Sequence, residues 1–209
     1  MESKNILSII DRINDMEKVW IIPYGIIWNY YFCLKKRFEG TKEWEKEIIK
    51  TTLPASKREI YVHSPESICS TIPKIDPILT MNHLVVMIAL FQELVNETAK
   101  LIFPDLKPNK YGDVSIQDFL NKNKTKNILN KMEREQITLA KKTRDCYIHH
   151  DSKTDSRWVK SFKDIYNIAV PEEIQIQDIF QNKLGKDFFH QVEDWYELMM
   201  KISNTIRTF

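Results

Sequence analysis

The chain has 209 residues, of which 43% are hydrophobic, 11% aromatic and 29% charged. This composition is typical of a globular protein and excludes the disordered and fibrous classes. Only 4 glycines and 8 prolines are present, and so few turn residues disfavour a β-sandwich or barrel, which needs a turn roughly every 8–12 residues. The sequence therefore predicts a helical protein.

The cysteines and the apolar stretches indicate a cytoplasmic location. Cys33, Cys69 and Cys146 are widely spaced and include no C-x-x-C pair, so neither a disulfide framework nor a thiolate zinc site is indicated. The uncharged stretch from Val19 to Leu34 has 16 residues and falls short of the roughly 20 residues that span a membrane. We expect neither a membrane span nor a secretory leader.

Charge is unevenly distributed, although the net charge is only +2. Between Lys100 and Arg144 there are eleven Lys and Arg residues against five Asp and Glu residues, whereas residues 170–200 hold seven acidic residues and two lysines. A basic middle region favours an anionic ligand. The alternative is a lysine-rich face that only contacts solvent.

The spacing of apolar residues predicts the elements of the first third of the chain. We expect a first helix over Ile6–Val19, an aromatic helix over Ile26–Phe38 that is apolar nearly all round, and a short helix over Trp44–Ile49. Four prolines between Thr51 and Pro77 indicate a loop, interrupted at most by a strand at Arg58–His63.

Helix start and stop signals organise the rest of the chain. Asp76-Pro77 is typical of a helix N-terminus, and Pro104 ends the helix that follows. Ser115 to Asp118 resembles a capping box. Further helices are predicted at residues 125–149, 158–166 and 188–206. On the first of these, the side chains expected to face inward are Ile128, Leu129, Met132, Ile137, Leu139 and Ala140.

These elements predict a single all-α domain over residues 1–209. It is a helical bundle of about six or seven helices, with two long antiparallel helices at its centre. We find no internal repeat and no linker that divides the chain. We also expect a homodimer formed through the two long helices, which the aromatic helix extends because a helix that is apolar all round needs more than one neighbour.

One window concentrates reactive side chains. The phosphate-loop, dinucleotide-binding, zinc-protease and nucleophile-elbow motifs are all absent from the sequence. Residues 141–151, in contrast, combine cations, two imidazoles and two carboxylates, in the order Lys141-Lys142-Thr143-Arg144-Asp145-Cys146-Tyr147-Ile148-His149-His150-Asp151.

The segment from Arg144 to His149 resembles the R-[N/D]-x-x-x-H motif of the HEPN superfamily. Members of this superfamily are all-α proteins of toxins, CRISPR effectors and other prokaryotic conflict systems, and many are metal-independent ribonucleases. Their motif lies late in a long helix that follows another long helix and a variable loop, an order that residues 77–151 match. The N-terminal 76 and C-terminal 58 residues lie outside the resemblance.

The spacing of the motif bears on how a site can form. At about 100° per residue, Arg144 and His149 lie roughly 140° apart around a helix. One helix alone therefore presents the two side chains poorly to a single phosphate. Two such helices packed about a two-fold axis place both motifs around one phosphate, which is what the resemblance implies and what an isologous dimer supplies.

We assign roles from the chemistry of RNA cleavage, in which the 2′-hydroxyl attacks the phosphate. His149 is the expected general acid or base, since imidazole titrates near neutral pH. Arg144 is expected to bind the phosphate through its planar fork, and Asp145, four residues before His149, to orient the imidazole. The residues expected to bind substrate are Lys141, Lys142, Tyr147 and His150.

The function predicted from these residues is a metal-independent endoribonuclease without a cofactor. The resemblance implies a toxin or antiviral effector that is restrained by an antitoxin or regulatory protein. A non-catalytic module of the same fold that binds RNA or protein is the first alternative. In a plainer interpretation of the motif itself, Arg144 and Asp145 form surface ion pairs and His149 caps the helix.

The second alternative is an HD-type metal-dependent phosphohydrolase. His150-Asp151, with His83 or His63 upstream and Asp187 or Asp194 downstream, resembles the metal-binding pattern of those all-α enzymes. We also expect Glu93, on the preceding long helix, either to pair with Arg144 and orient it or to be exposed.

Overall fold

The computed structural model describes residues 2–46, 49–52 and 60–208. These residues fall into two compact units, one formed by residues 1–16 with 80–209 and the other by residues 17–79. The prediction of an all-α helical bundle is confirmed. The division into one domain or two stays open, and the two units are described separately below.

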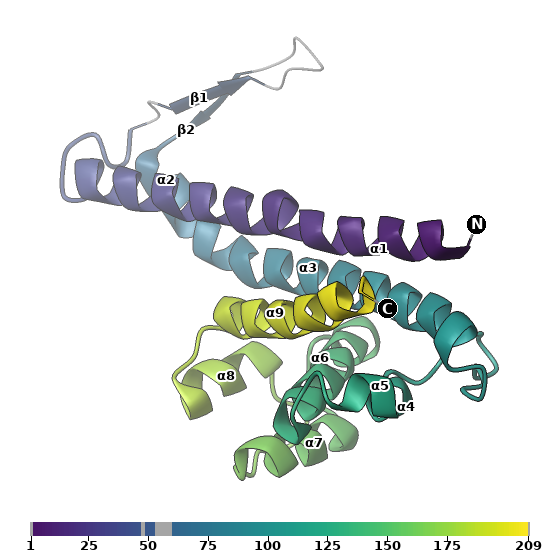
Figure 1. The fold of residues 1–209 in the computed structure, drawn as a ribbon. Coiled ribbons are helices and arrows are strands. Elements are labelled where there is room, and N and C mark those ends of the chain that lie inside the picture. Colours follow the sequence, from purple (N-terminus) through teal and green to yellow (C-terminus); the bar gives the residue numbers. More distant parts are fainter. Residues whose placement is uncertain (1, 47–48, 53–59, 209) are drawn as a thin grey trace. The chain divides into compact units, whose positions relative to one another are not determined.

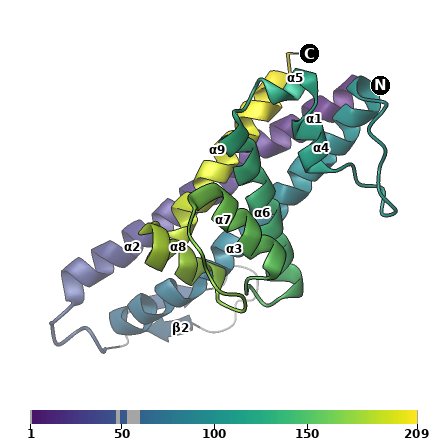
Figure 2. The ribbon, with the colours of Figure 1, turned by 90° about the horizontal axis from the view of Figure 1, so that it is seen from below.

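The larger unit holds most of the helices, which pack side by side in two views (Figures 1 and 2). Helix α3 (Pro65–Ile102) belongs to this unit from residue 80 onward. The other elements are α1 (Glu2–Met16), α4 (Ile116–Leu120), α5 (Asn123–Lys126), α6 (Lys131–His149), α7 (Ser156–Tyr166), α8 (Ile176–Leu184) and α9 (Phe188–Ile206).

The smaller unit contains a π-helical turn, two helical segments and a hairpin. Its elements are η1 (Glu17–Ile21), α2 (Ile22–Phe38), β1 (Ile49–Thr52), β2 (Ile60–His63) and the first part of α3. The two strands pair antiparallel, with Ile49 opposite His63. The predicted strand is thereby confirmed over residues 60–63, while Arg58 lies outside the described residues.

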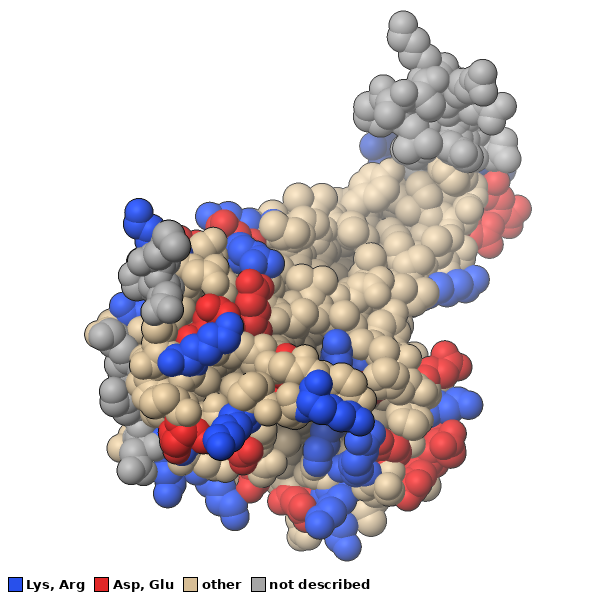
Figure 3. Space-filling model, turned by 90° about the vertical axis from the view of Figure 1, so that its right-hand side faces the viewer, with Lys and Arg blue, Asp and Glu red and all other residues tan. Residues whose placement is uncertain are grey.

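Several apolar side chains of α2 are accessible. Ile26 is 63% exposed and Phe32 60% exposed, and only Leu34 of this helix is buried. Successive rings contact one another along the helix, with Trp28 against Tyr31 at a centroid distance of 5.0 Å. The space-filling view includes a broad area without charged side chains (Figure 3).

Two predictions for this part of the chain are wrong. Trp44 lies in a turn and Ile49 begins a strand, so the short helix expected there does not form; Ile48 lies outside the described residues. Helix α3 begins at Pro65 and not at Asp76-Pro77. The Ser64 hydroxyl accepts from the backbone N–H of Ser67 at 3.0 Å, which makes Ser64 the cap and Pro65 the first helical residue.

Helix α3 continues through Pro73 and Pro77 because its flanking residues keep burying an apolar face. Cys69 and Ile72 are buried in the smaller unit, and Phe91 and Leu94 are fully buried in the larger one. By length and composition α3 passes the test for a membrane span, but 56% of its most apolar window is buried. Core helices of globular proteins have the same property.

The core of the larger unit is aromatic. Trp158 stacks on Phe162 with ring centroids 4.9 Å apart, and Phe180 meets Trp195 edge to face at 5.7 Å. Phe180 belongs to α8, a helix that the sequence pattern did not predict. The last predicted helix, 188–206, coincides with α9, whose Tyr196 hydroxyl donates to the carbonyl of Ile13 at 3.1 Å.

Candidate functional site

Helix α6 carries the predicted site and begins at a defined cap. The Asn130 side chain accepts from the backbone N–H of Glu133 at 2.9 Å, and the Glu133 carboxylate accepts from the N–H of Asn130 at 2.7 Å. This capping box starts the helix at Lys131, six residues after the predicted start. Met132 lies in the first turn and is 58% exposed, so its predicted inward orientation is wrong.

The buried face of α6 sets the direction of the site residues. Ile137, Ala140, Thr143 and Cys146 recur every three residues and are buried. The indole N–H of Trp158 donates to the Thr143 hydroxyl at 2.8 Å, which fixes the rotation of α6 against α7 next to Arg144. Burial raises the pKa of the Cys146 thiol to about 11, so this cysteine is not an activated nucleophile.

Arg144, Asp145 and Lys141 form a chain of charge-assisted hydrogen bonds. Arg144 Nη1 donates to Asp145 Oδ1 at 2.9 Å, and Lys141 Nζ donates to Asp145 Oδ2 at 2.8 Å. Burial opposes ionisation of Asp145, but the hydrogen bonds from Lys141 and Arg144 outweigh it and hold the pKa of this carboxyl below its usual range. Asp145 therefore carries a fixed negative charge that holds both cations.

Arg144 keeps donors free for a ligand. Its side chain is 31% exposed, and its Nη2 amino group forms no hydrogen bond among the described residues, whereas its Nε–H is buried and so out of reach of a ligand. Asp145 uses one face of the guanidinium, while the side chain lines a cavity of about 400 Å³ against α3. A guanidinium that is held on one side and unsatisfied on another suits an anion with several oxygens.

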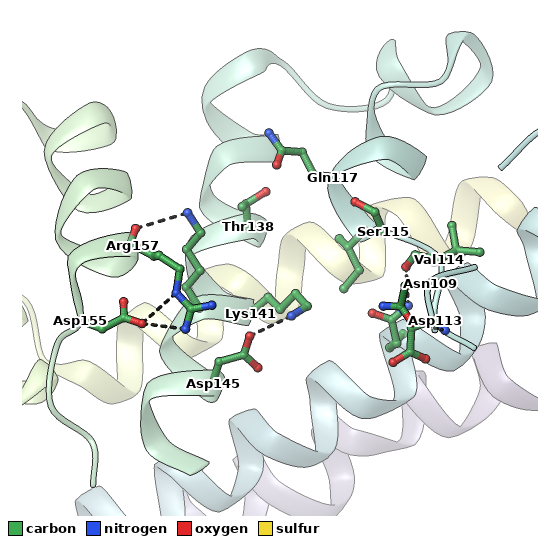
Figure 4. Close-up of a pocket in the computed structure, with 13 residues that line it drawn as sticks. Asn109, Asp113, Val114, Ser115, Gln117, Thr138, Lys141, Asp145, Asp155 and Arg157 are labelled. Atoms are coloured by element: carbon green, nitrogen blue, oxygen red, sulfur yellow. Dashed lines mark hydrogen bonds and ion pairs between the residues drawn. The ribbon is translucent and has the colours of Figure 1, made fainter. Parts of the chain in front are cut away.

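A second cavity has a volume of about 330 Å³ (Figure 4) and shares lining residues with the first. Lys141, Asp113 and Gln92 line both cavities, and Asp145 lines the second. Helices α4 and α7 complete the second cavity with Gln117 and the ion pair Asp155–Arg157, whose atoms lie 2.8 Å apart. Lys141 therefore lies between two adjacent hollows.

Sequence reasoning missed most of the second cavity. Arg157 follows the helix cap Asp155, and Gln117 lies inside the short helix that begins after the cap Ser115. Polar residues at helix N-termini are common, so their only sequence signal is the cap itself. The packing of α4 and α7 against α6, which brings them together, has no local sequence signature.

The other predicted substrate-binding residues make separate contacts. Lys142 Nζ donates to the Ser161 hydroxyl of α7, and burial lowers the pKa of this ammonium. The Tyr147 hydroxyl donates to Asn82 Oδ1 of α3 at 3.0 Å. His150 Nε2 lies 3.8 Å from Asp155 Oδ2. Tyr147 of α6 contacts Asn82 of α3, whereas Arg144, earlier in α6, lies near residues 88–93, later in α3. The two helices therefore run antiparallel.

His149 is the last residue of α6 and is exposed. It lines neither of the two cavities, and among the described residues no hydrogen bond joins it to Asp145. One copy of the chain therefore does not bring His149 to Arg144, as their spacing around a helix predicts.

Glu93 lies near Arg144 but has another partner. Its carboxylate accepts from Arg12 Nη1 of α1 at 3.1 Å, while Glu93 and Arg144 line the same cavity. Of the two alternatives for Glu93, pairing with Arg144 is therefore wrong, and the side chain is 43% exposed. Arg12 is nearer to Glu93 because α1 packs along the same part of the unit.

The described side chains include no group of three or more His, Cys, Asp and Glu residues that is placed to hold a metal ion. His83, one of the candidate ligands of the HD pattern, is buried beside the ring of Tyr196. His150 lies against Asp155, and His63 belongs to the smaller unit.

Comparison of the chain with protein-family models, with curated proteins and with solved structures finds no match. Function is therefore inferred from the residues and their geometry.

Proposed function

We propose that this protein is a metal-independent endoribonuclease of the HEPN type, acting in the cytoplasm as a toxin or antiviral effector. The observation that carries the proposal is the fixed guanidinium of Arg144. Asp145, which is also hydrogen-bonded to Lys141, holds it at the wall of a cavity, with its Nη2 amino group unpaired among the described residues. The oxygens of a phosphate bound there would accept hydrogen bonds from the free donors of the guanidinium, which would also stabilise the negative charge that develops during cleavage.

The chemistry assigned to the site needs no group from outside the chain except a second copy of it. The 2′-hydroxyl of RNA loses its proton to a base and attacks the adjacent phosphorus, and the bond from phosphorus to the 5′-oxygen breaks. The leaving oxygen takes a proton from an acid, so the products end in a 2′,3′-cyclic phosphate and a 5′-hydroxyl. His149 performs proton transfer and Arg144 binds the phosphate oxygens.

A second copy of the chain completes the site. His149 lies at the exposed end of α6, where it can meet the Arg144 of a partner across a two-fold axis. Two large apolar side chains of the two long helices are exposed, Val86 of α3 at 48% and Ile148 of α6 at 44%. They support a contact through these helices. Light scattering at micromolar concentration should give a dimer, and a strict monomer would contradict this step.

Site variants test the enzyme directly. The purified protein is incubated in EDTA with mixed RNA, beside Arg144→Lys and His149→Ala. Each variant should lose about a hundredfold or more of the cleavage rate, the scale of losing a general acid or base. Arg207→Lys and His190→Ala make the same replacements at exposed positions of α9 and its C-terminal cap and should cleave as the wild type does.

The same assay separates the alternatives. A wild type that binds RNA without cutting it would support the non-catalytic module. Cleavage that appears only with Mn²⁺ or Mg²⁺ would support the HD-type phosphohydrolase.

A further inference from the structure

Four cavities follow one another along α6 and share lining residues. Gln117 and Thr138 line three of them, with volumes of about 330, 320 and 280 Å³. Lys141 then joins the first of these to the cavity of about 400 Å³ at Arg144. Because successive cavities share lining residues, we call the four together, between α6 and its neighbours α3, α4 and α7, the α6 groove.

The α6 groove is lined by more cations than the site itself needs. Nine Lys and Arg residues and seven Asp and Glu residues border the four cavities, and on the face in Figure 3 the two signs of charge are interspersed. Attraction of an anion must therefore come from those cations whose charge no carboxylate neutralises. The nine cations are Lys100, Lys126, Lys131, Arg134, Lys141, Lys142, Arg144, Arg157 and Lys160.

Three of these cations are available at the end of the groove away from Arg144. Arg134 Nη1 donates to the backbone carbonyls of Lys126 and Leu129 at 2.8 and 2.6 Å, which fixes the guanidinium without neutralising it. The ammonium groups of Lys126 and Lys160 form no ion pair among the described residues. Fixed or unpaired cations in a row suit a chain of phosphates.

The middle of the groove offers uncharged hydrogen-bonding groups. Gln117 of α4 and Thr138 of α6 lie on facing elements (Figure 4). The Gln117 side-chain amide has no hydrogen-bond partner among the described residues. An amide can donate to and accept from the edge of an unpaired base, and single strands are the form of RNA whose base edges proteins reach.

We propose that the α6 groove is a track for single-stranded RNA that leads to Arg144, with a base held beside Gln117. This inference rests on the proposed function and adds the form of the substrate. From Lys131 to Arg144 the helix rises about 20 Å, which holds roughly six nucleotides at about 3.4 Å each in a stacked strand and fewer in an extended one.

The test uses fluorescence anisotropy with labelled RNA of three to twelve nucleotides in EDTA. All proteins carry His149→Ala, so that binding is measured without cleavage. The groove variant adds Lys126→Glu and Lys160→Glu. The control variant adds Lys163→Glu and Lys183→Glu, the same change of charge at exposed lysines that line none of the four cavities.

We expect the groove variant to bind at least about tenfold more weakly near 0.1 M salt, with a salt slope reduced by about 1.4 for two lost phosphate contacts on a single strand. The control variant should stay within about twofold of its parent. Affinity should rise with length up to about six nucleotides and then level off. Equal losses in both variants, no loss in the groove variant, or tighter binding of a duplex than of a single strand would each overturn the track.

Failure of the track and failure of the nuclease are distinguishable. If binding depends on the groove but the wild type never cuts RNA, the track is supported and the ribonuclease proposal fails. If cleavage depends on Arg144 and His149 but not on Lys126 and Lys160, the ribonuclease is supported and the track fails.

Discussion

The buried imidazole of His83 should make the stability of the protein fall in mild acid. His83 lies in α3 and is 5% exposed, and burial lowers its pKa from 6.5 to about 3. Between pH 3 and pH 6.5 the unfolded chain therefore binds a proton at His83 that the folded protein does not bind. Stability is unaffected above pH 6.5 and decreases as the pH falls from 6.5 toward 3. Between pH 7 and pH 5 the decrease is about 2 kcal/mol, from about 1.36 kcal/mol for each of 1.5 pH units.

Urea unfolding at pH 7 and pH 5 measures this term when the wild type is compared with His83→Gln, which cannot titrate. All other titrating groups are common to both proteins, so they cancel from the difference. The stability advantage of the wild type over the variant should decrease by about 2 kcal/mol at the lower pH. For His190→Gln, at an exposed position, the stability difference from the wild type should change by less than about 0.5 kcal/mol between pH 7 and pH 5. A difference between wild type and His83→Gln that is independent of pH would refute the reasoning.

Three further predictions concern α6. Asp145→Asn should lower the free energy of unfolding in urea at pH 7 by about 1–3 kcal/mol, because it weakens two charge-assisted hydrogen bonds. Because the pKa of Asp145 is lowered in the folded protein, this cost should shrink as the pH falls through that pKa. A cost that is independent of pH would contradict the prediction. Thr143→Val should cost about 1–3 kcal/mol because it leaves the buried indole N–H of Trp158 unsatisfied, seen as roughly 2–4 °C of Tm per kcal/mol; no measurable cost would contradict that hydrogen bond. Mass spectrometry after iodoacetamide treatment at pH 8 should show exposed Cys33 modified well before buried Cys146, and the opposite order would mean that this part of α6 opens.

Helix ends show where sequence signals sufficed and where they competed. The apolar spacing of residues 188–206 predicts α9 correctly, because its buried face is continuous. The start of α3 was misplaced, since Ser64-Pro65 and Asp76-Pro77 carry the same cap signal and only packing selects the first. At α6 the capping box of Asn130 starts the helix six residues after the start that the apolar spacing predicts.

The candidate site was predictable in its charged residues but not in its contacts. Lys141 and Asp145 are four residues apart on one helix, so their hydrogen bond follows from helical spacing, whereas the bond between the adjacent residues Arg144 and Asp145 does not. Gln117 and Arg157 reach the same region from other helices. Such tertiary pairings depend on how α4 and α7 pack against α6, which no local pattern encodes.

Cleavage of two matched oligonucleotides in EDTA tests the central claim most directly. One is ordinary RNA and the other carries 2′-O-methyl groups, which remove the nucleophile while the bases and phosphates stay the same. The account predicts that the first is cut to products ending in a 2′,3′-cyclic phosphate, identified by mass spectrometry, and that the second stays intact. Equal cleavage of both, or cleavage of neither, would contradict the proposed ribonuclease.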